Sequence, residues 1–190
     1  MMVPFYERSK DWPPSPLLMQ ALDHCVRRND ALDLGCGAGR DTRGLLQQGF
    51  RVTAVDQNPE AFLYMQDLLQ ENLTLVQSSM ETFPFATYDL INARYSLPFI
   101  QHDLFEETIS KIKQALRPDG IFTGQLFGVH DTWNTPGTTT TFCSREQAQW
   151  LLHDLSIITF LEEDEDGQTA LEEPKHWHVF HFIARKIESI

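Results

Sequence analysis

The 190-residue sequence has few cysteines and no long apolar run. Its three cysteines, Cys25, Cys36 and Cys143, are scattered and odd in number, which excludes a disulfide framework and favours a reducing compartment. No segment approaches the length that crosses a membrane, and the first residues lack the apolar core of a secretory signal. We therefore expect a cytoplasmic protein with no membrane partner, long enough for one α/β domain and too short for two.

Positive charge is also scarce. Lysine and arginine total 15 against 27 acidic residues, which gives a formal net charge of -12. Because such a surface repels phosphate backbones, we expect no nucleic-acid partner. Much of the negative charge gathers around Gly167, where we expect the solvent-exposed tip of a hairpin, the alternative being a site that attracts cations. The acidic residues of this segment are Glu162, Glu163, Asp164, Glu165, Asp166, Glu172 and Glu173.

Strand-like and helix-like segments alternate along the chain, which predicts a mostly parallel sheet with helices on both faces. The predicted strands are 31–36, 51–56, 73–77, 88–93, 121–127, 156–163 and 176–185. The predicted helices are 16–28, 40–48, 59–71, 103–116 and one that begins with the capping box Ser144 to Gln147. The fold class is thus α/β: a Rossmann-like, doubly wound, seven-stranded sheet with an antiparallel C-terminal hairpin. We expect a single domain over residues 1–190, with an N-terminal arm and helix over 1–30 and the core over 31–190.

A glycine-rich turn follows the first predicted strand. Gly35, Gly37 and Gly39 let the backbone turn tightly and let a ligand approach without meeting a Cβ. The second strand ends on Asp56, 21 positions after Gly35, the separation expected of an acid that reaches a ribose above the turn. These features predict a cofactor that contains adenosine.

The turn lacks the third glycine of the dinucleotide fingerprint G-x-G-x-x-G, because that position is Arg40. Asp33 precedes the turn and would repel a pyrophosphate. The string from Asp33 to Gly39 instead resembles motif I, D-x-G-x-G-x-G, of the class I S-adenosylmethionine-dependent methyltransferases. The runs 83–91 and 116–120 resemble further landmarks of that family. Among its members the chain looks most like the small bacterial tellurite-resistance-type methyltransferases.

This resemblance implies S-adenosylmethionine (SAM) as cofactor, with S-adenosylhomocysteine (SAH) as product. The family's usual adenine-binding acid falls on Ser79, so we expect the contact to the adenine from the backbone near Met80 and Glu81. The predicted cofactor-binding residues are Asp33, Gly35, Cys36, Gly37, Gly39, Asp56, Gln57, Met80, Glu81 and Asn92.

Residues at the carboxyl end of the fourth strand should face the transferred methyl group. Arg94 and Tyr95 lie there, and His130 follows the fifth strand, so the predicted catalytic residues are Arg94, Tyr95 and His130. Arg94 suits an anionic substrate, the alternative being an ion pair with a nearby acid. His130 suits a general base, the alternative being a solvated loop histidine. The absence here of an Asn/Asp-Pro-Pro-aromatic run argues against nucleobase or glutamine methylation.

Two further features are open in the sequence. Tyr6 and Trp12 in the N-terminal arm could cover the cofactor as a lid, or the arm could pack on the domain. His176 and His178 share one face of a strand, but no carboxylate or cysteine is spaced to complete a metal site, so we predict no metal.

We therefore predict a SAM-dependent methyltransferase that acts on a small-molecule acceptor by in-line displacement, as a monomer or weak homodimer. One alternative is an NAD(P)-dependent oxidoreductase, against which Arg40, Asp33 and the lack of a Tyr-x-x-x-Lys pair all count. Another is a non-catalytic, cofactor-binding module with the same fold.

Overall fold

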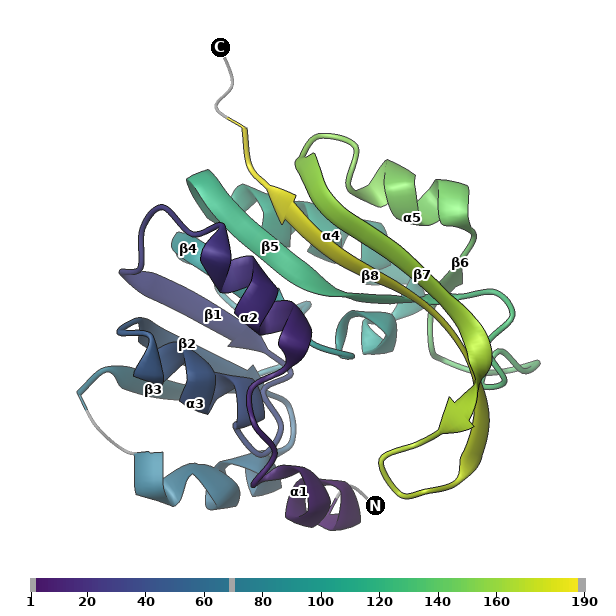
Figure 1. Cartoon of the computed structure of the whole chain (residues 1–190), viewed down its shortest axis with the longest axis horizontal. Coiled ribbons are helices and arrows are strands. Elements are labelled where there is room, and N and C mark those ends of the chain that lie inside the picture. Colours follow the sequence, from purple (N-terminus) through teal and green to yellow (C-terminus); the bar gives the residue numbers. More distant parts are fainter. Residues whose placement is uncertain (1–2, 69–70, 188–190) are drawn as a thin grey trace.

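The computed structural model describes residues 3–68 and 71–187, which form one sheet flanked by helices (Figure 1). The helical elements, with η for 3-10 turns, are α1 (Val3–Ser9), α2 (Pro16–Asp23), α3 (Arg40–Gln47), η1 (Pro59–Leu68), η2 (Leu97–Phe99), η3 (His102–Leu104), α4 (Phe105–Gln114) and α5 (Arg145–Leu151). The strands are β1 (Asp30–Leu34), β2 (Arg51–Asp56), β3 (Leu73–Gln77), β4 (Tyr88–Ala93), β5 (Leu116–Gly128), β6 (Phe142–Cys143), β7 (Ser156–Gln168) and β8 (Pro174–Arg185).

The order of strands across the sheet is β3-β2-β1-β4-β5-β8-β7, and the two-residue β6 pairs with the end of β5. Strands β1 to β5 pair in parallel, whereas β8 runs antiparallel to both β5 and β7. The order reverses between β1 and β4, so their carboxyl ends leave a crevice where a ligand can bind. The predicted fold class is therefore confirmed.

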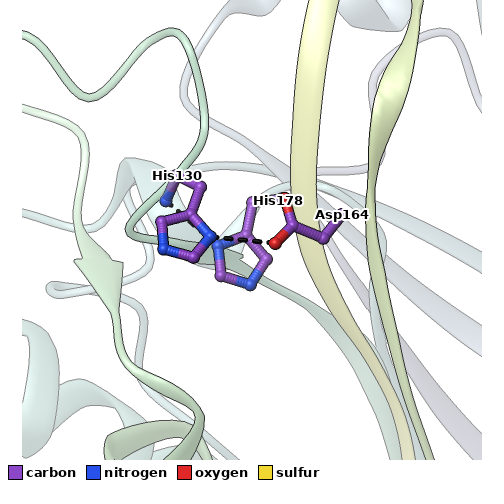
Figure 2. Close-up of side chains that lie close together, drawn as sticks. All are labelled: His130, Asp164 and His178. Carbon is purple, nitrogen blue, oxygen red and sulfur yellow. Dashed lines mark hydrogen bonds and ion pairs between the residues drawn. The ribbon is translucent and has the colours of Figure 1, made fainter.

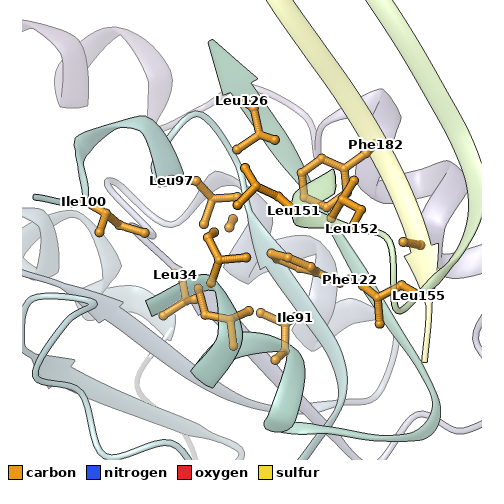
Figure 3. Packing of buried hydrophobic residues seen from close by; sticks show 14 of the residues in the cluster. Leu34, Ile91, Leu97, Ile100, Phe122, Leu126, Leu151, Leu152, Leu155 and Phe182 are labelled. Carbon is orange, nitrogen blue, oxygen red and sulfur yellow. The ribbon is translucent and has the colours of Figure 1, made fainter. Parts of the chain in front are cut away.

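Alternate residues of the central strands supply two separate cores. Ile91 and Phe122 belong to the larger core, which residues of α4 and α5 complete (Figure 3). Leu90 faces the other way and packs with Leu18 and Leu45 of α2 and α3. This two-residue period is what a sheet covered on both faces requires.

Some predicted boundaries are wrong. The helix predicted to reach residue 28 ends at Asp23, and Arg28 instead donates to the carbonyl of Leu22 at 3.1 Å, which satisfies the helix end. The segment after residue 58 forms the 3-10 element η1 rather than an α-helix, although Asn58 caps it by accepting the N–H of Glu60 at 3.0 Å. Residues 69 and 70 of that predicted helix, which was expected to reach residue 71, lie outside the described residues.

Strand β5 is longer than predicted, and α4 is shorter. The helix predicted over 103–116 is η3 followed by α4, which ends at Gln114. The strand then starts at Leu116, because Asp119 and Gly120 exchange backbone hydrogen bonds with Lys186 at 2.9 Å each. By contrast, the predicted capping box of α5 is present in full at Ser144 and Gln147.

Only Glu172 and Glu173 of the acidic segment lie in the turn of the hairpin. Residues 162–166 lie inside β7, paired with β8, and the turn is made by residues 169–173. The strands continue because several of these carboxylates are hydrogen-bonded to histidine side chains of β8, which satisfies their oxygens within the strand pair. Within residues 3–68 and 71–187, no helix has the length and apolarity to cross a bilayer.

Candidate functional site

The turn after β1 has a left-handed backbone at each glycine, with φ of 68° at Gly35, 53° at Gly37 and 83° at Gly39. A Cβ at Gly35 would lie 2.4 Å from the Cβ of Ser96, so the turn is pressed against the segment after β4. At Gly37 the nearest heavy atom would be 3.6 Å away, on Tyr6. The turn is therefore tight on its inner side and has room beside Gly37.

Asp56, the last residue of β2, holds this turn in place. One of its carboxylate oxygens accepts the N–H of Gly37 and the other accepts the N–H of Asn58, both at 2.9 Å. Burial raises the pKa of the Asp56 carboxyl, although both N–H groups oppose the shift. The lone pairs that remain can accept hydrogen bonds from the hydroxyl groups of a ribose.

Asp33 and Asp41 form a buried acid pair beneath the turn. The amide of Asn92 donates to Asp33 at 2.8 Å and to Asp41 at 3.3 Å. Thr42 donates its hydroxyl to Asp33 at 2.6 Å, and Ser15 donates its N–H and hydroxyl to Asp41 at 2.7 and 2.8 Å. Burial, and then the charge of Asp41, raises the pKa of Asp33 to about 7. Since these donors are all neutral, the pair is a site that favours an ammonium group.

These residues line one cavity of about 1270 Å³. Cavities that hold one drug-sized ligand measure roughly 300–1,000 Å³, so this one has room for two small molecules. Most of the predicted site residues border it: Asp33, Gly35, Cys36, Gly37, Asp56, Gln57, Met80, Glu81, Arg94 and Tyr95.

Three of the predicted site residues are absent from the described lining of the cavity: Gly39, Asn92 and His130. Gly39 precedes α3, where a Cβ would lie 2.4 Å from the Met65 side chain, so its role is to let η1 pack closely. Asn92 is buried and orients the two acids. Their predicted part in cofactor binding is therefore indirect in this geometry.

Cys36 lies in the turn and is buried. Burial, and then the charges of Asp33 and Asp56, raises the pKa of its thiol well above the ordinary value. The thiol therefore stays protonated and acts as a small packing residue rather than a nucleophile.

His130 lies away from the cavity, against the C-terminal hairpin (Figure 2). Its Nδ1 is 2.8 Å from the carboxylate of Asp164, and its ring stacks on His178 with 4.6 Å between centroids. Its backbone N–H donates to Nδ1 of His178 at 3.0 Å. This geometry gives no support to the predicted catalytic role of His130.

His130, Asp164 and His178 bring one ligand atom each to within 4.8 Å of one another. The sequence reasoning, which found no carboxylate to join the histidines, missed this grouping because the pairing of β7 with β8 creates it. Both ring nitrogens of His178 already have partners, since Nε2 lies 3.0 Å from Glu162. The cluster acts as a hydrogen-bonded link between the hairpin and the loop after β5.

Tyr95 follows β4 with a φ of 49°, and its N–H donates to the side chain of Gln125 at 2.9 Å. The guanidinium of Arg94 lies 5.1 Å from the centre of the Tyr95 ring. Burial, and then the charge of Glu163, raises the pKa of the Tyr95 hydroxyl to about 12. Tyr95 is therefore a neutral phenol at physiological pH and cannot serve as an anionic base.

Helix α1 and the turn between β7 and β8 lie at the same end of the molecule in Figure 1. Residues of both elements line the cavity. Tyr6 of α1 lines it and is itself buried, so the N-terminal arm packs on the domain and also borders the site. The hairpin turn, residues 169–173, lines it from the other side. Arg8 and Glu172 form an ion pair that joins the two.

Several lining residues were missed at the level of sequence. Asp41 stands in the first turn of a helix, where an acid needs no functional explanation because it complements the helix dipole. Phe99, Phe127 and Trp177 also line the cavity, and Trp177 reaches it through the pairing of β8 with β5. Phe99 could have been suspected from sequence only because it is an aromatic residue in the segment after β4, where the site was expected.

Known proteins resemble this chain in sequence and in fold. Residues 31–120 match a family described as "Methyltransferase domain". A relative of known activity, malonyl-[acyl-carrier protein] O-methyltransferase of Acetivibrio thermocellus, is 33% identical over 113 residues, which are 53% of this chain and 36% of that protein. The chain thus spans about a third of that relative's length, and 65% of the length of a second, from Geobacillus sp. (strain WCH70).

Solved structures share the whole fold. TehB from Haemophilus influenzae superposes with a TM-score of 0.74 at 17% identity, over 90% of this chain and 61% of that chain. The 1,6-didemethyltoxoflavin-N1-methyltransferase of Burkholderia thailandensis, solved with its substrate and SAH, gives 0.67 at 23% identity, over 91% and 77%. These comparisons confirm the predicted resemblance to SAM-dependent methyltransferases, and they agree with SAM as the cofactor class.

Proposed function

We propose that this chain, whose residues 31–120 carry a methyltransferase domain, transfers the methyl group of SAM to a small-molecule acceptor. The observation that carries the proposal is that the glycine turn, Asp56 and the acid pair open into one cavity with volume to spare. SAM would supply a methyl group on a sulfonium sulfur, which a nucleophile can displace in line.

The residues present fit this cofactor. The acid pair of Asp33 and Asp41 suits the ammonium of its methionyl end, and Asp56 suits the ribose hydroxyls. Gln57 follows Asp56 directly, and Met80 and Glu81 follow the end of β3, which pairs with β2 at Asp56. All three line the cavity and are proposed to hold the adenine. Arg94 and Tyr95 are proposed to face the acceptor.

The chemical demand on the protein is modest. An in-line displacement requires that the acceptor be close, aligned and shielded from water. Tyr6 and the turn 169–173 cover the cavity and would exclude water once both ligands are bound. We also propose that the protein works in the cytoplasm, as a monomer or weak homodimer.

The first experiment is thermal unfolding with SAM, SAH or NAD added separately. A ligand that binds only the folded state raises the midpoint by mass action. We expect a rise with SAM and SAH and none with NAD, and a much smaller rise for Asp56→Ala, which loses both the ribose contact and the bond to Gly37. A rise with NAD alone would instead establish the oxidoreductase alternative.

A non-catalytic module would bind SAH as well. Turnover separates it from an enzyme, and methylation of para-nitrothiophenolate by SAM is the assay.

A further inference from the structure

Aromatic rings form a continuous wall on the acceptor side of the cavity. Phe127 is its centre, with ring centroids 6.1 Å from Tyr95, 6.1 Å from Phe99, 5.9 Å from Trp133 and 6.1 Å from Trp177. All five residues border the cavity. Phe99 is 50% exposed and Trp133 is 41% exposed, so the wall is open to a ligand rather than part of a closed core.

A buried cation lies behind this wall. The Lys175 side chain is fully buried, and its Nζ lies 4.1 Å from the centre of the Trp133 ring and 4.3 Å from that of Trp177. Asp131, also buried, pairs with it. Because the π faces of both indoles already interact with an ammonium, they offer little to a second cation. The wall therefore does not suit a quaternary ammonium ligand and suits a neutral or electron-rich ring.

Two guanidinium groups lie beside the wall. Arg94 and Arg40 both line the cavity, and they are close enough that the charge of Arg94, after burial, helps to lower the pKa of Arg40. Among the described residues, no carboxylate lies within ion-pair distance of Arg94. Its guanidinium lies instead against the face of the Tyr95 ring. Glu163 also lines the cavity and is hydrogen-bonded to His181 at 2.8 Å. The guanidinium of Arg94 is therefore free to pair with an anionic ligand.

The described lining of the cavity includes no histidine, and its carboxylate beside Tyr95, Glu163, is already hydrogen-bonded to His181. Tyr95 has its pKa raised to about 12 by burial, so its phenol does not ionise at neutral pH. A protonated alcohol or ammonium acceptor would need a base to take its proton. An acceptor that arrives already ionised would not.

We propose that the acceptor is a flat aromatic molecule with an anionic nucleophile, an aryl thiolate or a phenolate, whose ring stacks on Phe99, Trp133 and Trp177 and whose charge faces Arg94. This inference rests on the methyl transfer proposed above. A bond forms between the anionic sulfur or oxygen and the methyl carbon, and the carbon–sulfur bond to the sulfonium breaks. Its electron pair stays on the sulfur, which becomes the neutral thioether of SAH, and no proton moves.

The test measures binding before turnover. The protein is titrated by calorimetry with SAH, and the SAH complex is then titrated with para-nitrophenolate at a pH where that probe is ionised. Cyclohexanecarboxylate, an anion without an aromatic ring, and N-methylpyridinium, an aromatic cation, are the matched probes. We expect para-nitrophenolate to bind at least about tenfold more tightly than either, because only it uses both the wall and Arg94.

Substitutions test whether para-nitrophenolate binds at this wall. Phe99→Leu and Trp133→Leu should each weaken para-nitrophenolate about 3- to 10-fold, and Arg94→Gln about tenfold, with SAH affinity of the two wall variants unchanged. Trp150→Leu is the control, because that tryptophan is 56% exposed on α5 and is not among the residues that line the cavity. Turnover is then followed with SAM and para-nitrothiophenolate, whose thiolate absorbance disappears on methylation.

The outcomes separate the two proposals. Failure to bind SAH would overturn the methyltransferase proposal itself. Tight SAH binding with equal affinity for all three probes, or with preference for the pyridinium, would overturn only the aromatic-anion acceptor. If Phe99→Leu, Trp133→Leu and Arg94→Gln all leave the affinity for para-nitrophenolate unchanged, the probe binds elsewhere. That result would also refute the inference.

Discussion

Asp33 and Asp41 lie on either side of the Asn92 amide, which donates to a carboxylate oxygen of each. Two carboxylates this close and this deeply buried cannot both ionise freely, and the pKa of Asp33 is raised to about 7 by burial and then by the charge of Asp41. The two carboxylates therefore repel each other in the free protein, and a bound cation would reduce that repulsion.

The first prediction concerns ligand affinity and pH. An ammonium group binds best to ionised Asp33, so SAH affinity should rise as the pH increases through about 7 and then level off. Asp33→Asn should bind SAH at least about tenfold more weakly, since a charged hydrogen bond is lost. Calorimetry on both proteins at about pH 6 and about pH 8 checks this, with the variant correcting for titration of the ligand's own amine. Parallel pH profiles would refute the assignment.

The same carboxyl should lower the stability of the free protein at high pH. Its pKa is raised on folding, so its contribution to stability is complete below the ordinary value of 3.8 and is lost as the pH rises to about 7. At about pH 8, Asp33→Asn should be more stable than the wild type by ~2 kcal/mol in urea unfolding. A variant that is less stable at that pH would show that the hydrogen bonds of Asp33 outweigh the cost of its buried charge.

The glycine turn allows a sharp contrast between two alanine variants. Gly35→Ala places a Cβ 2.4 Å from that of Ser96 at a φ of 68°, so it should unfold or destabilise the protein by at least about 3 kcal/mol. Gly37→Ala has 3.6 Å of clearance and should cost only about 1 kcal/mol. Because Gly37 lines the cavity, that variant should remain folded and lose SAH affinity. Thermal unfolding with and without SAH measures both effects; similar midpoints for the two would contradict the prediction.

The buried pair of Lys175 and Asp131 should tolerate joint replacement better than the loss of its anion. Asp131→Asn leaves a buried ammonium without its counter-ion and should cost about 3–5 kcal/mol. Lys175→Met with Asp131→Asn should recover part of that loss, since no buried charge remains. Urea unfolding of the single and double variants forms the cycle. An additive double variant would mean that the two residues are not coupled.

Stability of the C-terminal hairpin should pass through a maximum with pH. The hydrogen bond to Asp164 raises the pKa of His176, and His130 and His176 lower the pKa of Asp164. The carboxyl contribution is lost as the pH falls through its folded pKa, and the histidine contribution as the pH rises through its own. The window lies between about pH 4 and about 6.5, the ordinary values. In His176→Gln, the stability should no longer fall as the pH rises above this window. Urea unfolding at several pH values measures this, and a profile equal to that of the wild type would contradict the prediction.

The succession of strands and helices along the chain and the glycine turn that lines the cavity follow from sequence because they depend on local signals. Alternating elements, the glycine turn and Asp56 are each encoded within a few neighbouring residues. The capping box at Ser144 was predicted for the same reason, since it joins residues three positions apart.

The rest depends on contacts between distant segments. The β7–β8 pairing places Asp164 beside His178 and carries Trp177 to the cavity, and neither position has a local signature. Asp41 becomes part of the site only because Asn92, 51 positions later, reaches it. The acidic run suggested a solvated turn because its histidine partners lie on another strand.

The ion pair between Arg8 and Glu172 joins the first helix of the chain to its last hairpin. During synthesis, the glycine turn and β1 to β5 leave the ribosome long before Glu172 is made. A partly synthesised chain would therefore present the cofactor half of the cavity with one side still missing. We therefore expect a ligand to stabilise most strongly those molecules whose synthesis has reached the hairpin.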